Sequence, residues 1–237
     1  MIPDPLHRDD DMRRHRLGER AFEKGNHGGY INGRRANWKR RFRRFQIALL
    51  TLALSYARAQ EPGTMFVLIE PKFMKAPVSA PIAGAEKTEL VAALMDGTEV
   101  AYLPRAKFEE MKMNWAAFAA QAQKSAEAEL QAAKTAYVRD GKKVIAYAAV
   151  RSPRGLIASA VLAPKFLDLF KNTLGEKVLV VIPNRTTAYV FPALASKYQD
   201  YAPLIFKAYR ATAFPVSTEV FELSADGMKA VGAFEEP

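Results

Sequence analysis

The sequence predicts an α+β fold: one compact domain in which three to four helices pack on a mixed or antiparallel sheet. Short apolar runs with strand character, amphipathic helical stretches and Asp-Gly turn signals follow one another without strict alternation. Doubly wound α/β folds require that alternation, so a mixed sheet fits better. The chain has 237 residues, of which 49% are hydrophobic, enough to bury a core.

The first 59 residues predict a leader that is not part of the domain. Residues 1–38 are polar and lack hydrophobic periodicity, which indicates a disordered segment. Residues 39–59 have the order of a secretory signal: a block of arginines, an apolar run at 47–55, and Ala57 and Ala59 at the positions that a signal peptidase reads. Because a bilayer span needs roughly 20 apolar residues, we expect export to the periplasm or the medium without a permanent membrane anchor.

The first half of the body is expected to hold one long helix and a few short elements. Residues 60–90 are rich in proline and alanine and predict an extended segment that precedes a domain at 91–237. Asn114 is a good N-cap for a helix over 115–134, whose apolar stripe we interpret as core packing. The other expected elements are a short strand at 67–69, a helix turn or strand at 89–95, a strand at 99–103 and a short helix from Pro104.

The second half is expected to supply most of the sheet. Its most apolar run, residues 178–182, predicts a central strand covered on both faces, with an antiparallel neighbour at 187–191. The other expected elements are a hairpin of 137–139 and 144–150 with a two-residue turn, a helix over 164–174 closed by Gly175, a helix broken near Asp200 and Pro203, and a terminal hairpin of 219–223 and 228–231.

The positive charge is concentrated in the leader. Of the formal net charge of +10, residues 1–59 hold 14 basic and 6 acidic side chains, whereas residues 60–237 hold 21 and 19. A nucleic-acid-binding domain would need a basic surface of its own, so we expect no nucleic acid as a partner of the mature domain. A cytoplasmic protein whose intact basic tail binds nucleic acid is the open alternative.

The body lacks the side chains of most common catalytic and metal sites. The three histidines, His7, His15 and His27, lie in the leader, and the chain has no cysteine. This excludes from the body a Ser-His-Asp triad, a cysteine nucleophile and a zinc site with His or Cys ligands. The five aspartates of the body are explained by turns, a helix cap and a solvated face. We therefore predict no cofactor, no metal site and no catalytic residue.

Two polar turns are the best candidates for a binding site. Arg151 and Arg154 follow one apolar strand, and Asn184 and Arg185 follow another. Guanidinium groups presented by such turns can bind an anionic ligand. The alternative is that both turns are ordinary solvated connections.

The apolar strand that ends in Pro183-Asn184-Arg185 resembles the uncharacterised bacterial YtpQ-like family. The similarity includes the helix start at 158–159 and residues 214–217, and covers roughly residues 90–232. The resemblance implies an α/β fold and no known activity. The family tends to have Asp-Gly-Tyr-Asp where this chain has Arg-Gly-Leu-Ile at 154–157, and Asp where it has Thr186, so any chemistry of those acids is absent here.

Together these observations predict an exported protein with a non-catalytic binding or interaction domain for a protein or small ligand. The alternative from another class is an enzyme whose site uses Arg185, Asn184 and a glutamate that folding brings close to them.

Overall fold

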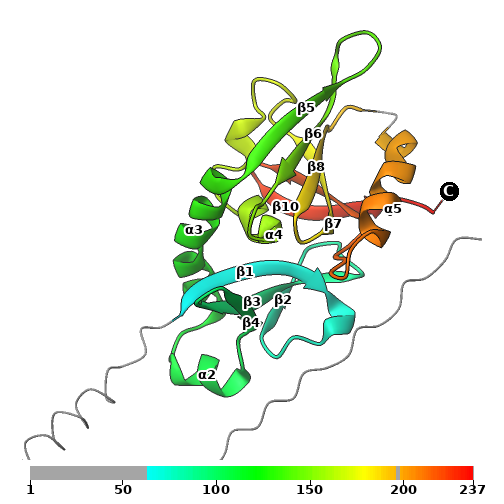
Figure 1. The fold of residues 1–237 in the computed structure, drawn as a ribbon. Helices are drawn as coiled ribbons and strands as arrows, with labels where there is room; N and C mark the ends of the chain where they lie inside the picture. The colour runs from blue at the N-terminus through cyan, green and yellow to red at the C-terminus, as the bar shows by residue number, and fades with distance from the viewer. Residues whose placement is uncertain (1–62, 196–197, 237) are drawn as a thin grey trace, which may run out of the picture. The chain divides into compact units, whose positions relative to one another are not determined.

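A computed structural model describes residues 63–195 and 198–236 of the chain. The predicted leader at 1–38 and the signal segment at 39–59, including Ala57 and Ala59, lie outside the described residues. What is described is a mixed domain with two antiparallel sheets and four α-helices (Figure 1).

The first sheet, sheet A, is built around strand β3 (Thr88–Asp96). Strand β1 (Thr64–Pro71) pairs with it along its whole length, whereas β2 (Ser79–Pro81) and β4 (Glu99–Tyr102) share its other edge. The 3-10 helix η1 (Lys72–Met74) follows β1. The predicted short strand at 67–69 is part of β1. The placement of residues 60–90 outside the domain is corrected, because residues 66–71 of β1 are buried in its core.

The second sheet, sheet B, has six strands in the order β10-β9-β7-β8-β6-β5. Its strands are β5 (Lys134–Arg139), β6 (Ile145–Arg151), β7 (Val178–Asn184), β8 (Thr187–Pro192), β9 (Glu219–Ser224) and β10 (Gly227–Ala233). Every residue of β7 is buried, and β8 is its antiparallel neighbour. Both predictions for this strand are confirmed, as is the terminal hairpin of β9 and β10.

Helices cover both faces of sheet B. The four α-helices are α2 (Arg105–Glu110), α3 (Trp115–Ala132), α4 (Ile157–Val161) and α5 (Ala202–Arg210), the last preceded by the 3-10 helix η3 (Tyr198–Tyr201). Val180 and Ile182 of β7 pack on the side of α3 and α4, and Leu179 and Val181 pack on the side of α5. This alternation is why an antiparallel strand can be apolar throughout.

Helix α3 connects the two sheets. Its N-cap, Asn114, accepts a hydrogen bond from the backbone N–H of Ala117 at 2.9 Å, as the sequence predicts. Its buried side chains serve both cores: Phe118 packs in the core of sheet A, whereas Ala126 and Leu130 pack in the core of sheet B. The two sheets therefore share one helix, and the predicted single sheet is corrected to two.

Two local predictions are wrong. The expected helix over 164–174 is a series of turns with the short 3-10 helix η2 (Leu167–Leu169), although Phe166, Phe170 and Leu174 are buried. The Phe170 carbonyl accepts three successive backbone N–H groups, from residues 173–175, which closes the chain into a turn. The turn between β5 and β6 is longer than two residues, because the carboxylate of Asp140 accepts two backbone N–H groups further along the loop.

Candidate functional site

The two polar turns predicted as a site lie side by side. The backbone N–H of Ser152 donates to the Thr186 carbonyl at 2.9 Å, and that of Ile157 donates to the Arg185 carbonyl at 3.2 Å. Folding thus brings the turn after β6 and the turn after β7 together. Their side chains, however, engage different partners, and the arginines do not form one cationic pocket.

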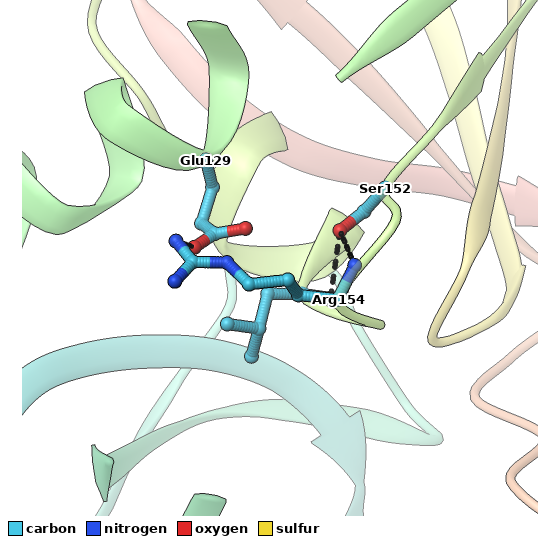
Figure 2. A network of polar contacts seen from close by, with 4 residues as sticks. Glu129, Ser152 and Arg154 are labelled. Carbon is cyan, nitrogen blue, oxygen red and sulfur yellow. Dashed lines mark hydrogen bonds and ion pairs between the residues drawn. The ribbon is translucent and has the colours of Figure 1, made fainter. Parts of the chain in front are cut away.

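Arg154 forms an ion pair with a buried carboxylate. Figure 2 shows its guanidinium in contact with Glu129 of α3. The side chain of Glu129 is fully buried. The same turn is held by Ser152, whose Oγ accepts the backbone N–H groups of Arg154 at 3.3 Å and Leu156 at 3.1 Å. The positive charge of Arg154 is therefore already paired, although half of its side chain is exposed.

Arg185 forms a second ion pair, which links the two sheets. Its Nη2 lies 2.9 Å from Oε1 of Glu70, which is at the end of β1 and is 2% exposed. The hydroxyl of Tyr102 accepts a hydrogen bond from the same Nη2 at 3.3 Å and donates one to Oε2 of Glu70 at 3.1 Å. The ring of Phe214 lies 5.3 Å from the guanidinium, within cation–π distance.

The electrostatics of this second cluster follow from burial and from the carboxylate. Burial raises the pKa of Tyr102 to about 12, and the charge of Glu70 adds to the rise, because both disfavour the phenolate. Burial alone would lower the pKa of Arg185, but the neighbouring Glu70 more than offsets it, so the pKa is raised. The cluster thus holds a neutral phenol beside a fixed cation. Within the described residues, the ion pair with Arg185 is the polar contact of Oε1 of Glu70.

Asn184 and Arg151 have different surroundings. The Oδ1 of Asn184 accepts the backbone N–H groups of Thr186 and Thr187, both at 3.0 Å, and its Nδ2 donates to the Ala208 carbonyl of α5 at 3.0 Å. Asn184 therefore fastens the turn after β7 to α5. Arg151 is exposed at the end of β6, on the side of α5. Anion binding by the four predicted residues stays a prediction.

A third buried carboxylate, Glu219, joins the two sheets through neutral hydrogen-bond donors. Its Oε1 accepts the backbone N–H groups of Glu86 at 2.7 Å and Lys87 at 2.9 Å, and its Oε2 accepts the hydroxyl of Thr88 at 2.6 Å. Glu219 starts β9 of sheet B, whereas Thr88 starts β3 of sheet A. Within residues 63–195 and 198–236 no basic side chain forms an ion pair with Glu219, so these three hydrogen bonds are what stabilise its carboxylate there.

Sequence reasoning missed all three buried glutamates. For Glu129 a signal was present: it follows the buried Ala126 by three positions and so lies on the apolar stripe of α3. For Glu70 the signal is that the strand 66–69 before it is entirely apolar. A charged residue on a buried face needs a partner, and that rule would have marked both positions.

The domain also has a cleft of about 660 Å³ between the end of β1, helix α5 and the C-terminal strand. It is lined by Pro71, Lys72, Phe73, Lys87, Phe206, Tyr209, Val216, Ser217, Thr218, Ala233, Phe234, Glu235 and Glu236. Apolar and aromatic groups make most of this wall, with two lysines and two glutamates among them. Arg151, Arg154, Asn184 and Arg185 do not line it.

Two classes of site find no support in the described part of the chain. Residues 63–195 and 198–236 contain no group of three or more acidic, histidine or cysteine side chains arranged to hold a metal ion. Within the same residues, no helix combines the length and the apolar character that crossing a membrane requires.

No family model matches the chain, and no curated protein or solved structure matches it. The resemblance to the YtpQ-like family therefore stays a prediction.

Proposed function

We propose that this protein is exported and that its domain is a non-catalytic binding module for a small ligand. The observation that carries the binding function is the cleft beside α5, which combines aromatic walls with charges of both signs. Concave sites of this size with a few polar groups are the usual form of ligand sites. Export is supported by the arginine block, the apolar run and the small residues of the leader.

The chemistry of the cleft favours a zwitterion with an apolar or aromatic side chain, such as an amino acid or a short peptide. Phe73 is largely exposed at its rim, ready to cover a flat apolar group. Lys72 donates a hydrogen bond to the Ala85 carbonyl, and Glu236 forms an ion pair with Arg210. Lys87 and Glu235 have no ion-pair partner among the described residues, so they can pair with the carboxylate and the ammonium group of a ligand.

Calorimetric titration of the full chain with phenylalanine, tyrosine and their dipeptides tests this function. We expect binding that Lys87→Glu and Phe73→Ala each weaken by about tenfold, because each removes one contact worth roughly 1.4 kcal/mol. The matched controls are Lys75→Glu and Leu194→Ala, two exposed side chains that do not line the cleft. Unchanged affinity in the cleft variants, or no binding by the intact protein, would reject the cleft as the site.

Export is tested separately by mass spectrometry of the N-terminal peptide and by fractionation of the native host. A mature chain that begins at Gln60 in the periplasm or the medium is the expected result. An intact leader in the cytoplasm would overturn export and would make nucleic-acid binding by the basic tail the hypothesis to test.

One observation favours a second candidate, an enzyme whose site is the pair of Arg185 and Glu70. Folding does bring a glutamate to Arg185, 2.9 Å away, as that hypothesis requires. Asn184, however, is fully engaged by its own turn and by α5. Turnover of any substrate that disappears in Arg185→Ala while the protein stays folded would favour the enzyme over the binding module.

A further inference from the structure

The hairpin of β5 and β6, residues 134–151, is the most basic part of the domain; we call it the hairpin arm. It contains five basic side chains and one acidic one: Lys134, Arg139, Lys142, Lys143 and Arg151, against Asp140. The whole body carries 21 basic and 19 acidic residues, a net charge of +2. Because the arm alone contributes +4, the remainder of the body is net negative, and the positive charge is localised here.

The arm also presents an open sheet edge. Among the strands that the structure describes, β5 is the last of sheet B and pairs only with β6, and all six of its residues are exposed. Alternate residues of such an edge strand turn their N–H and C=O groups away from the sheet, where another strand can bind them. Figure 1 shows the loop of the arm extending beyond the neighbouring elements, so access to it is open.

The side chains of the edge are arranged with charge at its ends. Lys134 and Arg139 flank the strand, and Lys142 follows in the loop, whereas the four residues 135–138 between them are uncharged. Tyr137 and Val138 in this middle part are large, exposed hydrophobic side chains. A segment that pairs with this edge would meet hydrophobic side chains at its centre and cations at its ends.

We propose that the hairpin arm binds an extended acidic polypeptide segment of another protein, which adds to sheet B as a seventh strand beside β5. Backbone hydrogen bonds would give the pairing, and acidic residues at the ends of the segment would contact Lys134 and Lys142. A second copy of the chain is a poorer occupant, because antiparallel pairing of β5 with itself would place Lys134 opposite Arg139. Nucleic acid is also poorer, because the uncharged centre offers no phosphate contacts.

Fluorescence anisotropy of the full chain with a labelled peptide, Glu-Glu-Thr-Val-Thr-Val-Glu-Glu, tests the proposal. We expect saturable binding that weakens with salt, and hydrogen exchange that slows in alternate amides of β5. The double variant Lys134→Glu/Lys142→Glu should lose about tenfold in affinity. The control Lys107→Glu/Lys124→Glu makes the same charge change on the exposed faces of α2 and α3 and should bind like the wild type.

Several outcomes would overturn the proposal. They are equal weakening by both double variants, equal binding of the peptide with lysine in place of glutamate, and slowed exchange outside β5. Tighter binding of single-stranded RNA or duplex DNA, lost in the arm variant, would assign the surface to nucleic acid instead. Concentration-dependent dimerisation that protects β5 would assign it to a second copy. None of these results depends on the cleft, because β5 does not line it.

Discussion

The two junctions that join sheet A to sheet B hold their buried carboxylates in different ways. Glu219 receives three hydrogen bonds of 2.6–2.9 Å from two backbone N–H groups and a hydroxyl, all neutral donors. Glu70 instead faces a guanidinium and a phenol, and one of its oxygens lacks a hydrogen bond within the described residues. Both oxygens of Glu219 therefore have hydrogen bonds, and this junction fixes the start of β3 against the start of β9.

The two junctions also differ in their access to solvent. Arg185 is 28% exposed and carries the aromatic ring of Phe214 on its surface, so a ligand can reach this cluster. Glu219 is 4% exposed, and its three donors, two backbone N–H groups and the hydroxyl of Thr88, belong to the single segment 86–88. We therefore assign a stabilising role to the Glu219 junction, whereas the Glu70 junction is the one of the two that a ligand can reach.

Disruption of the Glu219 junction should lower the stability of the protein most. Glu219→Ala leaves two main-chain N–H groups and the hydroxyl of Thr88 without their acceptor in a buried site. We expect the free energy of unfolding to fall by about 4 kcal/mol, since bonds to a charged group are worth more than neutral ones. Urea denaturation of the full chain measures it.

The control for this prediction lies on the same strand. Glu222 forms ion pairs with Lys177 and Lys229, both about half exposed, so Glu222→Ala should cost about 0.5 kcal/mol. Equal effects of the two substitutions would contradict the role given to Glu219.

Disruption of the Glu70 junction should lower the stability by a smaller amount. Arg185→Met leaves the buried carboxylate of Glu70 without its counter-ion, and we expect a loss of about 3 kcal/mol in the free energy of unfolding. The double variant Glu70→Gln/Arg185→Met removes the charge as well and should recover most of that loss. Denaturant titration of the two single variants and the double variant gives the coupling energy. Additive losses would show that the pair is not coupled.

These junctions also show where prediction from the sequence stops. Strand β7, its neighbour β8 and helix α3 were predictable because an apolar run, a turn and an N-cap are local signals. The junctions are not local: Thr88 and Glu219 are 131 residues apart, and Tyr102 and Arg185 are 83 apart. The split into two sheets depends on the same distant pairings, because β1 reads as an isolated apolar run until β3 is paired with it. The sequence placed the two candidate turns directly after strands β6 and β7, as the structure has them. It could not identify Glu129 and Glu70, the buried partners of the arginines in these turns.

The last prediction concerns the pKa of Tyr102 at the Glu70 junction and separates the contribution of burial from that of the Glu70 charge. Tyr102 has a pKa of about 12 in the folded protein, against an ordinary value near 10. The unfolded chain therefore loses this proton first as the pH rises, and the stability that depends on it is present below about pH 10 and lost through about pH 12. Ultraviolet difference spectra of the wild type against Tyr102→Phe isolate this phenol from the others.

In Glu70→Gln we expect the pKa of Tyr102 to fall below 12 and to stay above its ordinary value, because the carboxylate is gone while the burial remains. A pKa that does not change in Glu70→Gln would show that burial alone sets it, and that the carboxylate and the phenol do not act as one cluster.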